Sequence, residues 1–443
     1  MNLIYIHTHD SGRYFSPYGY AVPTPNIERL ADEGVTFRHA FCANPTCSPS
    51  RAAMLTGQYA HSAGMYGLSH RGFAMSDHSH HLTHVLSAQG YETVLSGVQH
   101  EAEIDKLAYQ RILRNEAYLQ EEGHKFAVSD YASARQAADY LKNEVPTDKP
   151  FFLSVGFVNT HRHYPPHAKD INPDRLRPPE GIPDTAQNRE DMAGLATALR
   201  VVDDCVGIVL EALAASDYQD NTLVLFTTDH GIAYPRYKCT LNDGGIGVAM
   251  IWRVPGLPAP GRTVDSLVSQ IDVFPTLCEL MGLTPPDWLQ GVSLCPLLYA
   301  KQDRVRDEVF AEVNFHAAYE PIRCVRTERY KYIRYWDTTR HTPVPSNIDD
   351  GIAKEYVVQH GFLEKDVPRE QLYDLALDPG EWVNLAPDPK MASVLKDMRA
   401  RLQTWQNSTG DPLLYSDELA LPAGASANRM TAYSAKENDL VRS

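Results

Sequence analysis

The amino-acid sequence predicts an α/β fold in which helices sandwich a large, mostly parallel mixed sheet, with a smaller C-terminal α+β subdomain containing a short antiparallel sheet. Apolar runs of strand length alternate with helix-like segments through roughly the first 300 residues, which is typical of sheets covered on both faces. This pattern changes near residue 315. A chain of 443 residues also exceeds the usual size of one hydrophobic core. We therefore expect a large domain over residues 1–315 and a subdomain with a tail over residues 316–443.

The strands and helices of the large domain are predicted from run length, residue type and end signals. Short runs rich in β-branched and aromatic residues predict buried strands at Leu3–His7, Glu92–Gly97, Phe151–Phe157 and Thr222–Thr228. Apolar residues at helical spacing predict helices at Asn26–Glu33, Asp130–Glu144, Ala193–Ala215 and Ile271–Met281. The first of these helices follows Thr24-Pro25 and stops at Gly34, a good pair of start and stop signals.

The C-terminal region has a different pattern. Ile322–Val325 and Tyr330–Trp336 flank a short polar segment and predict an antiparallel hairpin. A helix is expected near Met391–Gln406. The last twenty or so residues are rich in Ala, Ser and Asn, and we expect them to wrap over the surface or to be mobile.

Composition excludes some classes of partner. Lys and Arg number 41 against 56 Asp and Glu, a net charge of −15 that disfavours nucleic-acid binding. No run approaches the roughly 20 apolar residues that cross a bilayer, so no membrane partner is expected. The first six residues lack the features of a leader, which predicts a cytoplasmic protein as written, or a periplasmic one if a leader was removed. The seven cysteines include no CxxC pair, which disfavours a disulfide framework or a cysteine zinc site.

Polar residues follow each of the four predicted strands. Ligands bind beyond the carboxyl ends of strands in open α/β sheets, so these residues should meet at one edge. They are His9 and Asp10, His100, Asn159 and His161, and Asp229 and His230. The sequence therefore predicts a site rich in carboxylates and imidazoles at this edge.

The most specific string is Cys47-Ser48-Pro49-Ser50-Arg51, followed by Leu55-Thr56-Gly57. It resembles the C-x-P-x-R and L-T-G signature of the sulfatase family in the alkaline-phosphatase superfamily. The resemblance covers nearly the whole chain in the right order, through Thr24–Ala31, Phe226–Gly231, Lys238–Leu241 and Gln371–Leu375. Within the family, the segments Cys47–Ala52, Gly64–Leu68 and Phe226–Ile232 are most similar to the N-sulfoglucosamine sulfohydrolase (heparan N-sulfatase) branch. The resemblance implies an alkaline-phosphatase-like fold and hydrolysis of sulfate esters or sulfamates, with sulfated sugars among the substrates.

The resemblance also implies the parts of the mechanism. A maturation enzyme that generates formylglycine would oxidise Cys47 to an aldehyde, whose hydrate attacks sulfur. We expect Cys47 to lie just ahead of a helix, whose N-terminal amides suit an anion and an activated oxygen. In the family pattern Arg51 and Lys238 neutralise sulfuryl oxygens, His161 protonates the leaving group, and His100 takes the proton that releases sulfate. The partners implied are the substrate and the maturation enzyme. The sequence leaves the oligomeric state open, with a homodimer as the default because dimers are the commonest soluble assembly.

One divalent metal is implied, held by Asp10, Asp229, His230, the modified Cys47 and His9. The family usually has an aspartate where His9 stands. Calcium is the family default and prefers oxygen ligands, whereas two imidazoles favour manganese or zinc. The sequence leaves open whether His9 binds the metal or only hydrogen-bonds beside it.

A second departure concerns Val98. The family usually places a lysine two residues before the histidine matched by His100, and here the string is Gly97-Val98-Gln99-His100. The lost cation keeps two alternatives open. One is a phosphonate monoester or phosphodiester hydrolase on the same scaffold, and the other is a non-catalytic binding protein.

Overall fold

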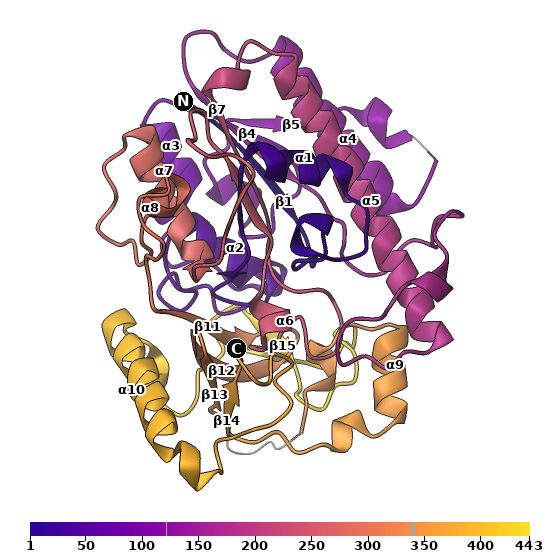
Figure 1. Cartoon of the computed structure of the whole chain (residues 1–443), viewed down its shortest axis with the longest axis vertical. Helices are drawn as coiled ribbons and strands as arrows, with labels where there is room; N and C mark the ends of the chain where they lie inside the picture. The colour runs from indigo at the N-terminus through magenta and orange to yellow at the C-terminus, as the bar shows by residue number, and fades with distance from the viewer. Residues whose placement is uncertain (121, 338–341) are drawn as a thin grey trace.

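The protein has two layered units in the computed structural model, which describes residues 1–120, 122–337 and 342–443 (Figure 1). The strands of the large sheet are β1 Asn2–Thr8, β2 Val35–Phe37, β4 Glu92–Gly97, β5 Arg111–Leu113, β6 Phe151–Gly156, β7 Thr222–Thr228, β8 Met250–Arg253 and β9 Arg262–Val264. Their order is β5-β4-β6-β1-β7-β8-β2-β9. The pairs from β5 to β7 are parallel, while β8 runs antiparallel to both β7 and β2. The predicted fold class, a mostly parallel mixed sheet, is confirmed.

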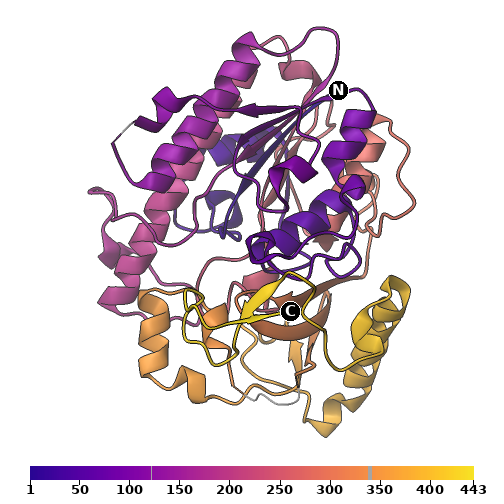
Figure 2. The ribbon, with the colours of Figure 1, turned by 180° about the vertical axis from the view of Figure 1, so that it is seen from behind.

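Helices cover both faces of this sheet (Figures 1 and 2). The helices are α1 Pro25–Glu33, α2 Cys47–Thr56, α3 Leu82–Ala88, α4 Lys125–Asn143, α5 Ala186–Ala214, α6 Asp243–Ile246, α7 Val273–Met281, α8 Cys295–Leu298, α9 Ile352–Gln359 and α10 Ala392–Thr409. Strand β1 alternates between two cores: Ile4 and Ile6 join the core under α1, α4 and α5, and Leu3 and Tyr5 join the core under α2, α3 and α7. This alternation follows from the two-residue period of a strand. No helix of the described residues combines the length and apolarity that a membrane crossing requires.

Two predicted helices begin earlier than expected. Helix α5 starts at Ala186 rather than Ala193, because the Thr185 side chain accepts a hydrogen bond from the Asn188 amide (3.2 Å) and caps the added turns. Helix α4 starts at Lys125 rather than Asp130. In both helices the added residues precede the regularly spaced apolar residues from which the helix was predicted.

The C-terminal unit contains a four-stranded antiparallel sheet in the order β11-β12-β13-β14. Its strands are β11 Glu308–Phe315, β12 Tyr319–Thr327, β13 Tyr330–Tyr335 and β14 Glu370–Asp374. The predicted hairpin corresponds to β12 and β13, and the predicted last helix to α10. The boundary between residues 315 and 316 stays a prediction, and β11 lies on its N-terminal side.

The chain ends in a small two-stranded sheet of β15 Ser426–Asn428 and β16 Leu440–Arg442. A second two-stranded sheet pairs β3 Ala40–Phe41 with β10 Val268–Ser269 in the large unit. The tail lies at the junction of the two units (Figure 2). It is held there by hydrogen bonds from Arg71 to the Ala435 carbonyl (2.9 Å) and from the Asn428 amide to the Ala317 carbonyl (2.7 Å). Of the two outcomes expected for the tail, it wraps over the surface.

A buried ion pair connects the segment just after α10 to the C-terminal sheet and predicts a pH effect on stability. Arg323 on β12 donates two hydrogen bonds to the Asp411 carboxylate (2.8 and 3.0 Å), and neither side chain is exposed. Burial alone would raise the pKa of Asp411, but Arg323 outweighs it and lowers the pKa to about 2. A carboxyl pKa depressed by folding contributes stability that is complete above about pH 4 and is lost as pH falls through about 2.

We expect Asp411→Asn to cost about 3 kcal/mol at pH 7, since it leaves the buried Arg323 with only the more distant Glu312 carboxylate (3.5 Å) as a charge partner. The variant should also lose less stability than the parent between pH 4 and 2. Urea unfolding at several pH values measures both effects, with the exposed Asp417→Asn as the control. An unchanged pH dependence in Asp411→Asn would show that another carboxylate is responsible.

Candidate active site

The structure brings together all nine side chains that the sequence predicted. His9 and Asp10 follow β1, His100 follows β4, His161 follows β6, and Asp229 and His230 follow β7. These strands are adjacent and parallel, so their carboxyl ends lie at one edge. Cys47 is the first residue of α2 rather than the residue before it, and Arg51 lies one turn further along that helix. Lys238 reaches the cluster from the loop after β7.

The Asp229 carboxylate contacts four other residues of the cluster. Its carboxylate accepts hydrogen bonds from the amides of Asp10 and His230 (both 2.9 Å) and from Arg51 Nη2 (3.0 Å), and it lies 3.2 Å from His9 Nδ1. Burial alone would raise the pKa of Asp229, but His230, Arg51 and His9 hold it well below its usual range. Asp229 is therefore a buried carboxylate that stays ionised.

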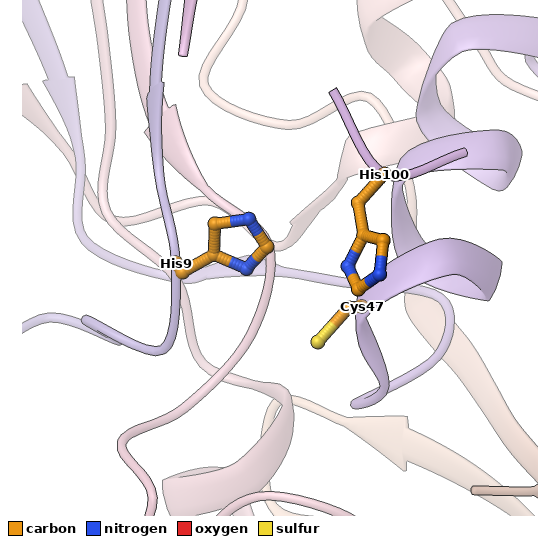
Figure 3. A group of neighbouring side chains, drawn as sticks. All are labelled: His9, Cys47 and His100. Carbon is orange, nitrogen blue, oxygen red and sulfur yellow. The ribbon is translucent and has the colours of Figure 1, made fainter. Parts of the chain in front are cut away.

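Cys47 faces the imidazoles of the cluster. Figure 3 shows His9, Cys47 and His100 pointing toward one another from three separate segments. The ligand atoms of these three residues lie within 4.8 Å of one another, and so do those of His9, Asp10, Cys47 and Asp229. The Cys47 Sγ atom also lies 3.4 Å from His230 Nε2. Because position 47 begins α2, the positive end of that helix adds to the attraction for an anion.

The donor atoms of this cluster fit a divalent cation. Asp10 Oδ1 is fully buried and accepts no hydrogen bond, although it faces His230 Nε2 at 3.4 Å. His230 Nδ1 donates to the Gly231 carbonyl (3.0 Å), which leaves Nε2 with its lone pair directed at Asp10 and Cys47 when the ring is neutral. An unsatisfied buried oxygen and an oriented imidazole nitrogen are the arrangement that a metal site requires.

The histidines differ in charge. Burial and Arg51 lower the pKa of His9 well below its usual value, and burial followed by Arg51 lowers that of His100, so both rings are neutral near pH 7. Burial also opposes protonation of His230, but Asp229 and Asp10 outweigh it and raise the pKa to about 9. A cation bound between these two carboxylates would oppose that increase and favour the neutral imidazole.

The Arg51 guanidinium does not contact Cys47 among the described contacts. It donates to Asp229 and to the Thr8 carbonyl (2.8 Å), and it lies 2.5 Å from His7 Nδ1. Burial would lower the pKa of Arg51, and Asp229 outweighs that effect, so the charge is retained. Arg51 thus neutralises the negative charge of Asp229 without contacting the cysteine.

Sequence reasoning missed Asp349. Lys238 Nζ is buried between Asp10 Oδ2 (2.9 Å) and Asp349 Oδ2 (3.1 Å). Asp349 belongs to the C-terminal unit, in a loop that no strand-end rule identifies. His316 was also missed, although it directly follows β11 and lines the same cavity as Lys238. The sequence predicted no strand ahead of His316, and the strand-end rule applies to parallel sheets, so no signal in the sequence pointed to it.

We expect Asp349→Asn to lower kcat/KM about tenfold, because Lys238 loses one of its two carboxylate partners and is no longer held over the site. Asp349 is a positioning residue, so the loss should appear in KM more than in kcat, and Asp349→Glu should restore part of it. Asp366→Asn is the control, since Asp366 is an exposed carboxylate of the same unit that has no described side-chain partner and does not line the cavity. Steady-state kinetics of the three variants measure this, and equal losses at 349 and 366 would contradict the assignment.

A cavity of about 270 Å³ opens in front of Cys47. His100, His161 and Lys238 line it together with Arg71 and with Lys436 from the C-terminal tail. Val98, the position of the missing family lysine, is not among the residues that line this cavity. His161 Nδ1 lies 2.7 Å from the Arg162 carbonyl, and because a carbonyl only accepts, Nδ1 carries the hydrogen and Nε2 is left to exchange a proton.

The chain was compared with known proteins. Residues 1–283 match the family described as Sulfatase, and residues 235–346 match the one described as N-sulphoglucosamine sulphohydrolase, C-terminal. An ulvan-active sulfatase of Formosa agariphila is 29% identical over 95% of this chain and 82% of its own. The human N-sulphoglucosamine sulphohydrolase is 28% identical over 91% of this chain and 88% of its own. Among solved structures, a 2-O GAG sulfatase superposes with a TM-score of 0.74 at 24% identity, covering 94% of both chains.

Proposed function

This chain belongs to the sulfatase family, and we propose that it hydrolyses a sulfate ester or sulfamate on a sugar, with formylglycine made from Cys47 as its nucleophile. The observation that carries this proposal is the position of Cys47. It begins α2 with its Sγ among the ligand atoms of His9, Asp10 and Asp229, and it opens onto the cavity that His100, His161 and Lys238 line. The substrate class is supported by the names of two relatives, the ulvan-active sulfatase and the N-sulphoglucosamine sulphohydrolase.

The charges of the site suit an anionic substrate. Three carboxylates, those of Asp10, Asp229 and Asp349, are opposed by the side-chain cations Arg51 and Lys238. A divalent ion added to this set makes the total positive, which attracts a sulfate group despite the acidic surface of the chain. Asp10, Asp229, His230 and His9 would hold that ion together with the oxidised residue 47. It would supply charge neutralisation for the sulfuryl oxygens.

For the identity of the metal we propose manganese or zinc, because two imidazoles lie among the ligand candidates. Calcium, the default of the family, is the alternative and would require His9 to remain a hydrogen-bonding neighbour of Asp229. Anomalous scattering at the metal edges, or elemental analysis of the purified protein, separates the two cases.

Two histidines of the site, His161 and His100, would transfer the protons of the proposed reaction. Residue 47, once oxidised and hydrated, would offer one hydroxyl as the nucleophile toward sulfur and a second whose deprotonation would allow sulfate to leave. His161, in the form protonated at Nε2 as well as at Nδ1, would donate the Nε2 proton to the departing oxygen or nitrogen and return to the neutral ring. His100, neutral beside Cys47, would accept the proton of the second hydroxyl. Lys238 would stabilise charge on the sulfuryl oxygens from its place between two carboxylates.

Two measurements test the proposal. Mass spectrometry of the tryptic peptide 39–51 from the native host should show an aldehyde at position 47, and a plain thiol there would exclude the mechanism. A panel of aryl sulfate, N-sulfoglucosamine and aryl phosphonate esters should show the fastest turnover with a sulfated compound. Faster hydrolysis of the phosphonate would favour the phosphonate or phosphodiester alternative, and no turnover at all by aldehyde-bearing protein would favour a binding protein.

A further inference from the structure

A second cavity, of about 720 Å³, lies apart from the catalytic one and shares none of its lining residues. It is formed by the loop before α1, the loop before α5, the segment leading into α6, and the turn after β14. Two of these segments also serve the active site. Arg236 and Tyr237 line this cavity while the next residue, Lys238, lines the catalytic one.

Four arginines line the second cavity, and none has a carboxylate partner among the described residues: Arg13, Arg175, Arg177 and Arg236. Arg13 and Arg236 donate only to backbone carbonyls, those of Ala40 (2.8 Å) and of Gly380 and Glu381 (3.1 and 2.9 Å). The side chains of Arg175 and Arg177 are exposed and have no described contact. Their charges are thus available to a ligand.

Most acidic residues that line the same cavity already form ion pairs with lysine or arginine side chains of the protein. Asp243 pairs with Lys331 (2.5 Å) and Arg326 (3.2 Å), and Glu381 also pairs with Lys331 (2.9 Å). Only Glu180 remains exposed and unpaired there among the described residues. In a chain with a net charge of −15, this surface is a local excess of positive charge.

Exposed aromatic rings accompany these charges. The Trp382 side chain is 54% exposed and stacks on the Arg236 guanidinium, whose centre lies 3.7 Å from the ring centroid. Tyr20 is 39% exposed and stacks on Tyr14 with 4.1 Å between the ring centroids. Rigid aromatic faces beside guanidinium groups suit a ring-shaped ligand that carries anionic substituents.

We propose that this cavity is a second, non-catalytic binding site for a sulfated oligosaccharide. Trp382 and Tyr20 pack against the apolar faces of sugar rings, and Arg175 and Arg177 bind the sulfate groups. The choice of sulfate over other anions rests on the proposed function. Binding of a chain at this site would raise the local concentration of further sulfated units near the catalytic cavity, because two loops border both.

Binding of a dextran sulfate oligosaccharide tests this proposal. All proteins carry Cys47→Ala so that the probe is not turned over, and titration calorimetry compares three variants of that parent. We expect Arg175→Ala with Arg177→Ala to weaken binding about tenfold, since two charge-assisted contacts are lost. Trp382→Ala should weaken it about fivefold. Arg29→Ala with Arg38→Ala removes two equally exposed arginines that have no described side-chain partner and lie outside the cavity, and should change binding less than twofold.

Three outcomes would overturn the proposal: equal losses in the cavity and control variants, equal binding of unsulfated dextran, or tighter binding of a DNA oligomer that depends on the same residues. The cavity substitutions in a chain that retains Cys47 should leave hydrolysis of a small aryl sulfate unchanged. If that chain hydrolyses no sulfate while the probe still binds through Arg175 and Arg177, the proposed function fails and the cavity remains a binding site for sulfated saccharides.

Discussion

Cys47→Ser is expected to abolish turnover, with a loss of at least about 10³-fold in kcat, and to trap the sulfate group on the protein. The serine oxygen would form a bond to sulfur while the bond from sulfur to the leaving oxygen or nitrogen breaks and His161 supplies the proton. Unlike a hydrated aldehyde, serine has no second hydroxyl for His100 to deprotonate, so the sulfate ester persists. Intact-mass measurement after incubation with substrate should show one added sulfuryl group per chain.

Cys205→Ser is the matched control, because this cysteine is equally buried but lies in α5, away from the site. It should retain the activity of the parent per folded molecule. Full steady-state turnover by Cys47→Ser would contradict both the nucleophile and the need for oxidation. A mass shift without turnover would support them.

The arrangement of the large sheet explains why much of the site could be predicted. Parallel strands align their carboxyl ends, so residues that follow separate apolar runs in the sequence meet in space, as His9, His100 and Asp229 do. The nucleophile, Cys47, came instead from the resemblance of Cys47–Arg51 to the C-x-P-x-R signature. Local patterns sufficed for these residues because each lies next to an element with a clear period.

The contribution of the C-terminal unit could not be predicted in the same way. Asp349 reaches Lys238 only because the antiparallel sheet docks against the edge of the large one, and no local pattern states how two sheets dock. The tail residue Lys436 lines the catalytic cavity for the same reason. The contact of Arg51 with Asp229 rather than with Cys47 likewise depends on side-chain geometry within a fully buried helix.

Asp229→Asn should remove both the metal and much of the stability that this edge of the sheet provides. Asparagine keeps the shape of the side chain but not its charge, so it leaves the buried Arg51 without its carboxylate. Breaking such a pair costs about 3–5 kcal/mol, which urea unfolding of the metal-free proteins should show. Metal content should fall, and kcat/KM should drop by at least about 10²-fold, because one anionic ligand is gone.

Asp203→Asn separates these two effects. The Asp203 carboxylate is also buried, but it accepts hydrogen bonds from the Asn26 and Ile27 amides at the start of α1 and pairs with no cation among the residues that the structure describes. Its loss should cost about 1–3 kcal/mol, as expected for buried amides left without an acceptor, while metal content stays at the parent level. If Asp229→Asn instead retained its metal and lost only stability, Asp229 would be the counter-ion of Arg51 alone, and the metal would depend on Asp10 and the imidazoles.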